Sequence, residues 1–174
     1  MTTTLYIFSG LPGTGKSTLA VALARSQSAA YLRLDTIEQA IKNSTQLNVG
    51  PEGYEVAYAL ALDNLKNGLN VVADSVNSLA ITRRAWHETA LAADSFFVDI
   101  EVVCSDTKEH KRRVEGRKSA INGLTLPTWQ QVLNRDYAEW TSDRMMVDTA
   151  GELPQESVSK LLSALESGNC WQRQ

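Results

Sequence analysis

The chain has 174 residues, the size of one ordinary domain with a single core. Its formal net charge is −3 at pH 7, which disfavours a protein that coats nucleic acid or an anionic membrane through its overall field. No apolar run approaches the length that spans a bilayer, and no cationic leader precedes the first apolar segment. We therefore expect a cytoplasmic protein without a membrane partner.

The first apolar segment, residues 5–8, predicts a strand, and a glycine-rich loop follows it directly. Residues 10–17 read GLPGTGKS and fit the pattern GxxxxGK[ST] of a phosphate-binding P-loop. Glycines let successive backbone N–H groups approach a phosphate, and the helix that we expect next adds its N-terminal N–H groups. Lys16 is expected to reach the β- and γ-phosphates, and the Ser17 hydroxyl to bind Mg²⁺. The expected nucleotide-binding residues of this segment are Gly10, Leu11, Pro12, Gly13, Thr14, Gly15, Lys16, Ser17 and Thr18.

The second strand candidate, residues 30–34, ends immediately before Asp35. Open parallel sheets bind ligands at the carboxyl ends of their strands, so Asp35 can accept the proton of an acceptor hydroxyl in phosphoryl transfer. Asp35 also suits the N-cap of a helix over residues 36–42, and the sequence leaves both interpretations open. A longer amphipathic helix is predicted over residues 51–68, and we expect residues 36–68 to cap the acceptor site.

The third strand candidate, residues 69–73, is followed by Asp74 at the same edge of the predicted sheet. Asp74 can hold Mg²⁺ through water, orient a neighbouring arginine, or cap a helix that begins near residue 79. We favour the first two roles because a second carboxylate beside a P-loop suits a metal-dependent site. A fourth strand is predicted over residues 96–103.

Residues 108–118 hold six of the seventeen lysines and arginines of the chain. Arg113 and Arg117 are four residues apart, so a helix through both would place them on one face. Such arginines can stabilise the charge of a transferring phosphoryl group. The irregular segment that follows, about residues 116–136, is typical of a lid that closes over such a site.

The last strand candidate, residues 145–147, is followed by the sequence DTAG, Asp148 to Gly151, and then by a helical pattern. DTAG fits the DxxG element of GTPases, but it comes after the last strand, and the chain has no guanine-reading NKxD. A GTPase is therefore disfavoured. The alternation of strands and helices predicts an α/β fold of three layers, with a five-stranded parallel sheet and helices on both faces.

Five segments together, GLPGTGKST, RLDTI, VVADSVN, RVEGR and VDTA, resemble the P-loop small-molecule kinases. This family includes zeta toxins, chloramphenicol phosphotransferase and the kinase domain of polynucleotide kinase. The stretch LPTWQQVLNRDYAEW is similar to the lid and post-lid helix of a bacterial branch described as predicted ATP-dependent kinases, or AAA-type P-loop ATPases.

The resemblance implies a role for each matching residue. Asp35 would be the acceptor base, Asp74 the aspartate of the third strand, and Arg113 and Arg117 the paired arginines of the lid. The loop over residues 148–150 would border the adenine, and Thr149 and Arg113 would contact the nucleotide. Kinases of polynucleotides usually carry D-x-x-R after the second strand, whereas DTIEQ follows here, which disfavours a nucleic-acid acceptor.

We therefore expect a single P-loop kinase domain over residues 1–174. It would use ATP and Mg²⁺ to phosphorylate a hydroxyl of a small molecule, with Lys16, Asp35, Arg113 and Arg117 as the catalytic residues. A nucleotide or polynucleotide 5′-hydroxyl kinase remains one alternative, and an ATP-binding switch without phosphotransfer is another. No motif in the expected cap identifies the acceptor.

Overall fold

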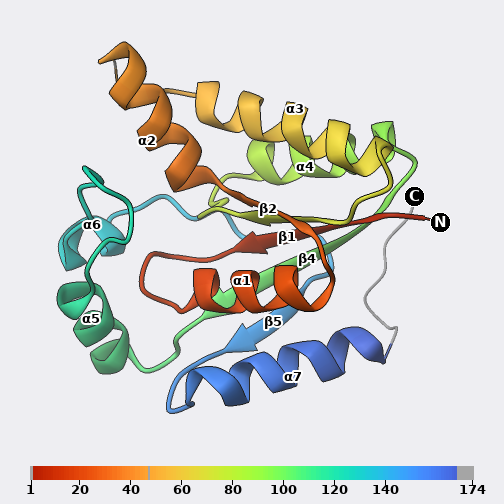
Figure 1. Cartoon of the computed structure of the whole chain (residues 1–174). Coiled ribbons are helices and arrows are strands. Elements are labelled where there is room, and N and C mark those ends of the chain that lie inside the picture. The colour runs from red at the N-terminus through yellow and green to blue at the C-terminus, as the bar shows by residue number, and fades with distance from the viewer. Residues whose placement is uncertain (1, 47, 168–174) are drawn as a thin grey trace.

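The computed structural model describes residues 2–46 and 48–167. Strands and helices alternate along the chain, as the sequence predicts (Figure 1). Within the described residues, no helix combines the length and the apolar character that crossing a membrane requires. In chain order the elements are β1 (Thr4–Ser9), α1 (Lys16–Ser26), β2 (Ala30–Arg33), α2 (Leu34–Thr45), α3 (Glu52–Lys66), β3 (Val71–Asp74), α4 (Ala80–Ala92), β4 (Phe96–Val103), α5 (Thr107–Gly116), α6 (Trp129–Leu133), β5 (Met145–Asp148) and α7 (Pro154–Glu166).

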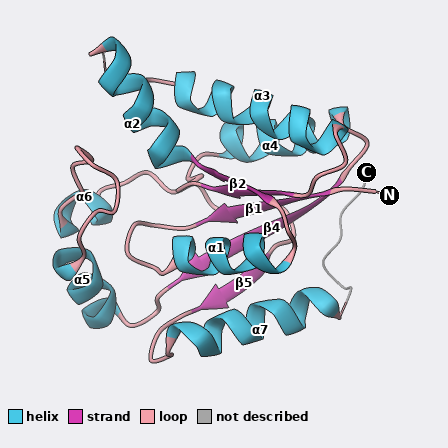
Figure 2. Cartoon of the chain, viewed as in Figure 1, coloured by secondary structure: helices cyan, strands magenta, loops and turns pink. Residues whose placement is uncertain are grey.

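The five strands form one parallel sheet in the order β2-β3-β1-β4-β5 (Figure 2). Tyr6 at the centre of β1 pairs with Val72 of β3 and with Val98 of β4. Because all strands point the same way, their carboxyl ends meet at one edge of the sheet, where ligands of such folds bind. The expectation of a five-stranded parallel sheet is confirmed.

The two faces of the sheet carry two separate apolar clusters. Leu5 and Ile7 of β1 pack with α3 and α4, where Trp86 is fully buried. Tyr6 and Phe8, which alternate with them, pack with α1 and α7 on the opposite face. This period of two along β1 buries both faces of the central strand. The predicted three layers are therefore present, with helices on both sides of the sheet (Figure 1).

Helices α5 and α6 and the loop between them lie beyond the carboxyl ends of the strands, at the left of Figure 1. Helix α5 ends at Gly116, and Arg117 follows in an extended conformation with φ −75° and ψ 150°. The expectation that Arg113 and Arg117 share one helix face is therefore wrong, since the helix stops between them. Within the expected lid, α6 is a short helix of five residues.

Candidate active site

The phosphate loop joins β1 to α1 and packs tightly against its surroundings. Gly15 has φ 94° at the N-cap of α1, and no side chain among the described residues caps this helix, so its first N–H groups are left for an anion. A Cβ on Gly13 would lie only 2.5 Å from Cγ2 of Val114 in α5. The glycines thus allow both the turn itself and the close approach of α5 to the loop.

Lys16 and Asp74 form an ion pair beneath the loop. The Lys16 Nζ atom lies 3.3 Å from Oδ1 of Asp74, and the two side chains are 11% and 2% exposed. The Tyr31 hydroxyl donates to the other oxygen of Asp74 at 2.6 Å. Burial alone would raise the pKa of Asp74, but the charge of Lys16 and hydrogen bonds from Tyr31 and Ser17 lower it below its usual value. Asp74 is thus a paired anion, and it does not cap α4, whose N-cap is Leu79.

Asp35 lies in the first turn of α2, two residues after β2 ends. The N-cap of α2 is Arg33, so the interpretation of Asp35 as the N-cap is wrong. Its side chain is 49% exposed, and the nearest cation is Nη2 of Arg33, at 3.8 Å from a carboxylate oxygen. A half-exposed carboxylate with one distant partner keeps lone pairs free to accept a proton or a hydrogen bond.

Two adjoining cavities meet at the phosphate loop. The first, which we call the α2 cavity, has a volume of about 260 Å³ and lies between the loop, the starts of α2 and α3, and residues 124–127. The second, the loop cavity, has a volume of about 490 Å³ and lies between the loop and the end of α5. Asp35 lines only the α2 cavity. Both cavities are lined by Lys16, Ser17, Arg33, Arg117 and Leu126.

Arg113 is fixed by protein groups on the far side of the loop. Its guanidinium donates to Oγ1 and to the carbonyl of Thr149, at 2.7 and 2.8 Å, and pairs with Glu109 at 2.7 Å. Thr149 Oγ1 donates in turn to the carbonyl of Thr14 in the phosphate loop, at 2.7 Å. Arg113 and Thr149 also line a third cavity of about 320 Å³ beside α7. Arg113 and Thr149, both predicted at the nucleotide, therefore contact each other, and Thr149 contacts the loop.

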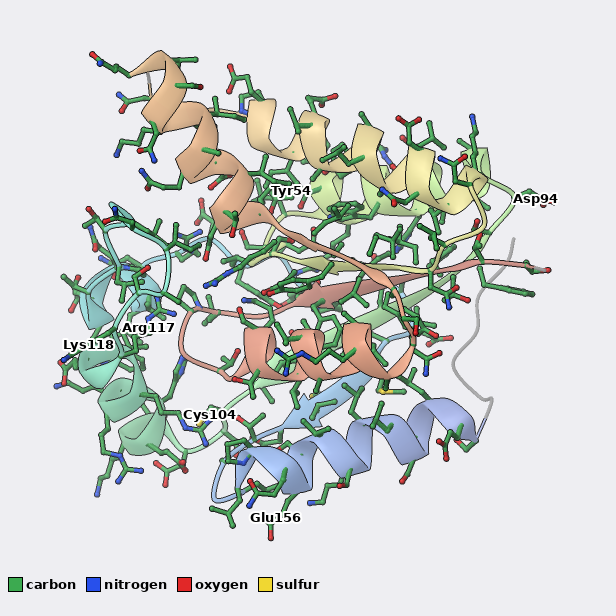
Figure 3. The ribbon with its side chains drawn as sticks, in the orientation of Figure 1. Tyr54, Asp94, Cys104, Arg117, Lys118 and Glu156 are labelled. Carbon is green, nitrogen blue, oxygen red and sulfur yellow. The ribbon has the colours of Figure 1, made fainter. Side chains whose placement is uncertain are left out.

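Arg117 lies between α5 and the phosphate loop, and it is labelled in Figure 3. It lines both the α2 cavity and the loop cavity. Its buried Nε atom has no hydrogen-bond partner among the described residues. Burial lowers the pKa of Arg117, the carboxylate of Asp35 opposes this, and Arg33 adds to it. Arg113, by contrast, is held by Thr149 and Glu109, although it also lines the loop cavity.

The segment expected to be the lid, residues 116–136, contacts both sides of the site. The Trp129 ring packs edge-on against His110 of α5, with centroids 5.1 Å apart. The Nε2 atom of His110 is 2.8 Å from the carbonyl oxygen of Pro12. At the other side, a Cβ on Gly123 would lie 3.3 Å from the amide of Gln39 in α2. The segment therefore bridges α5 and α2 across the α2 cavity.

Several residues that sequence reasoning missed also line the site. Glu38 lies three residues after Asp35 on α2, a spacing that the sequence shows. Arg33 is the last residue of β2, and its position two residues before Asp35 in the sequence also indicates that the two lie close together. The approach of Tyr54 and Arg135 depends on the packing of distant segments, so no local signal indicates it. The missed residues of the α2 cavity are Arg33, Glu38, Tyr54 and Arg135.

Among the described residues, no group of three or more His, Cys, Asp or Glu side chains could hold a metal ion. Mg²⁺ beside a phosphate needs only one or two protein oxygens, because phosphate oxygens and water complete its shell. The Ser17 hydroxyl is hydrogen-bonded to the ionised Asp74 carboxylate. This oxygen pair suits Mg²⁺ bound together with a nucleotide.

The P-loop lies at the carboxyl edge of a parallel sheet, and its lysine is paired with a buried aspartate. A second carboxylate lines the cavity beside the loop. These features are typical of a P-loop nucleotide-binding protein. Residues 5–135 match the family described as "AAA domain". The chain belongs to this family. Among curated proteins, no sequence matches the chain.

Solved structures with the same fold include several kinases. A candidate kinase from Chloroflexus aurantiacus has 19% identity and a TM-score of 0.74, over 94% of this chain and 98% of that one. A gluconokinase from Sinorhizobium meliloti has 18% identity and a TM-score of 0.65, over 93% and 91%. The APS kinase CysC from Mycobacterium tuberculosis, in complex with AMPPNP and APS, has 16% identity and a TM-score of 0.68, over 95% and 98%. The expected resemblance to P-loop kinases is confirmed at the level of the fold.

Proposed function

We propose that the protein is an ATP-dependent phosphotransferase that moves the γ-phosphate of ATP to a hydroxyl of a small molecule. The observation that carries the proposal is the pair of adjoining cavities at the phosphate loop. Lys16, Ser17, Arg33 and Arg117 line both cavities, so a phosphate held by the loop would lie against an acceptor in the α2 cavity. A protein that only binds or hydrolyses ATP needs no second cavity with a carboxylate.

The chemistry follows from the side chains around this boundary. The acceptor hydroxyl oxygen attacks the γ-phosphorus, the bond from phosphorus to the bridging oxygen of ADP breaks, and Asp35 accepts the hydroxyl proton. Lys16 and Arg117 place positive charge beside the transferring group, where charge spreads over its oxygens. Arg113 and Thr149 border the nucleotide and tie α5 to the loop.

Ser17 and Asp74 are the residues that would hold Mg²⁺, Ser17 directly and Asp74 through water. When bound, the ion would neutralise charge on the phosphate oxygens. Asp74 has a second role in this proposal, because its ion pair with Lys16 fixes the lysine beneath the loop. The cytoplasm remains the proposed location.

The α2 cavity supports a small acceptor over a polynucleotide. Its volume of about 260 Å³ is below the roughly 300–1,000 Å³ typical of sites for drug-sized ligands. It is bounded by α2, by α3 and by residues 124–127 of the expected lid. The gluconokinase and the APS kinase among the structural neighbours are kinases of small molecules by name, which agrees with this choice.

Isotope transfer tests the proposal. The protein is incubated with Mg²⁺, γ-labelled ATP and a panel of hydroxylated metabolites, nucleosides and 5′-hydroxyl oligonucleotides. We expect label in a small-molecule product, and much slower labelling of that product with the Asp35→Asn variant. Label in an oligonucleotide would favour the polynucleotide kinase instead. Nucleotide binding without any labelled product would favour the switch.

A further inference from the structure

The α2 cavity shares part of its lining with the loop cavity, and the rest of its lining belongs to the α2 cavity alone. At the loop end, its lining is shared with the loop cavity through Lys16, Arg33 and Arg117. The other end is lined by groups that do not reach the loop cavity, among them Glu38, Tyr54 and Arg135. These groups line the α2 cavity but not the loop cavity, so they are available to recognise the acceptor.

Cations outnumber acids in the lining of this cavity. Lys16 pairs with Asp74, and Arg33 has Asp35 at 3.8 Å. The Arg135 guanidinium has no carboxylate within 4.0 Å among the described residues, and its charge opposes the rise that burial causes in the pKa of Glu38. An exposed arginine that lines a polar cavity can bind a carboxylate or a phosphate with two parallel hydrogen bonds.

Glu38 is held in place at the same end. A Cβ on Gly53 would lie 2.4 Å from Cγ of Glu38, so the start of α3 packs directly on this side chain. Burial raises the pKa of Glu38, the neighbouring Asp35 adds to this, and Arg135 opposes it. A half-buried carboxyl group three residues from the proposed base can hydrogen-bond a hydroxyl of a bound molecule.

We infer that the acceptor is a small hydroxylated molecule that carries an anionic group, a carboxylate or a phosphate, which Arg135 binds. Glu38 holds a second hydroxyl, and the hydroxyl to be phosphorylated lies at Asp35. This inference rests on the proposed kinase function. Arg135 is then a specificity residue, because it contacts the acceptor but not the reacting atoms.

The test compares acceptors that differ in charge but little in size. Transfer from ATP is measured for D-gluconate, D-glucose, D-glucosamine and D-glucose 6-phosphate, and for D-glycerate, glycerol and glycerol 3-phosphate. We expect kcat/KM to favour the anionic members by about tenfold or more, as one charged hydrogen bond allows. The carboxylate and phosphate members then show which anion the site takes.

A variant of Arg135 tests whether this residue causes the preference for anionic acceptors. Arg135→Gln should raise KM for the preferred anionic acceptor about tenfold or more, with KM for ATP changed less than about twofold. Arg84→Gln is the matched control, since Arg84 lies on α4 with a side chain 72% exposed, and it should behave as the wild type.

The outcomes separate the two proposals. Preference for neutral or amine acceptors, or an unchanged preference in Arg135→Gln, would overturn the anionic acceptor and leave the kinase function standing. Transfer to none of the members, with ATP bound, would count against both proposals.

Discussion

Two charged regions adjoin Ser17, and they differ in how their charges are satisfied. Beneath the phosphate loop, Lys16, Asp74 and Tyr31 are joined by an ion pair and a hydrogen bond, and Asp74 is almost fully buried. In the α2 cavity, Asp35 is 49% exposed with a single cation at 3.8 Å, and Nε of Arg117 has no partner among the described residues.

The region beneath the loop is therefore held rigid by protein contacts, whereas the α2 cavity is available to a ligand. The region beneath the loop is satisfied by the protein itself, so it holds Lys16 in place before any ligand arrives. In the α2 cavity, the half-exposed Asp35 carboxylate keeps lone pairs that a ligand can satisfy. Substitutions beneath the loop should therefore reduce stability and activity together, whereas substitutions in the cavity should reduce activity alone.

Asp35→Asn should produce the largest effect on turnover. Loss of a general base typically costs about 10²–10⁴-fold in rate, and KM for ATP should stay within about twofold because Asp35 lines only the α2 cavity. The melting temperature should not change, since the side chain is half exposed. Steady-state kinetics at saturating ATP and thermal unfolding check both statements. A loss of ATP affinity with preserved turnover would make Asp35 a metal or structural residue.

Lys16→Ala should lower turnover by about 10²–10³-fold, the usual effect of removing one group that stabilises the transition state. It should also reduce the free energy of unfolding by about 3 kcal/mol, because the buried carboxylate of Asp74 loses its cation. The matched control is Lys66→Ala, at the exposed end of α3. Wild-type turnover in Lys16→Ala would refute the role of the loop, and wild-type stability would refute the fixed pair.

The ion pair between Asp74 and Lys16 should also affect how the free energy of unfolding depends on pH. Because the pKa of Asp74 is lowered by folding, the unfolded chain binds this proton more readily, and stability is lost as pH falls below about 4. Asp74→Asn should be less stable than the wild type at neutral pH and should lose less stability on acidification. Denaturant unfolding between pH 2 and 7 measures this, with the exposed Asp63→Asn as control. Parallel curves for Asp74→Asn and wild type would contradict the pairing.

The smallest effect that we expect concerns the lid. Amide hydrogen exchange across residues 116–136 should slow when a non-hydrolysable ATP analogue and Mg²⁺ bind, because Arg117 gains phosphate oxygens as partners. The double variant Arg113→Ala, Arg117→Ala should lose most of this slowing. Of the single variants, Arg117→Ala should lose more than Arg113→Ala, since Arg113 is already bound to Thr149 and Glu109. Equal exchange with and without nucleotide would remove the lid role.

The fold and the phosphate loop could be predicted because their signals are local. Each strand is a short apolar run, and β4 begins and ends where its run FFVDIEVV does. The loop motif lies in one continuous segment between a strand and a helix. Asp35 and Asp74 could be placed at the site because strand ends of a parallel sheet share one edge.

The remaining features depend on where helices stop and on contacts between distant segments. The four-residue spacing of Arg113 and Arg117 suggested one helix face, but α5 ends at Gly116, and glycine is a poor residue for continuing a helix. Arg135 lines the α2 cavity because the segment before it brings it there, and no local pattern in the sequence indicates that path. The sequence therefore indicated Asp35 and the segment that covers the acceptor end, but not which side chains of that segment line the cavity.

The most direct test of the central claim is to identify the product that carries the γ-phosphate. Phosphorus NMR of a reaction with ATP, Mg²⁺ and an acceptor found by isotope transfer distinguishes a phosphate monoester from inorganic phosphate. We predict one monoester formed for each ADP, with the Asp35→Asn variant forming it about 10²–10⁴-fold more slowly. Inorganic phosphate as the only product, formed equally fast by wild type and Asp35→Asn, would contradict phosphotransfer to a hydroxyl in the α2 cavity.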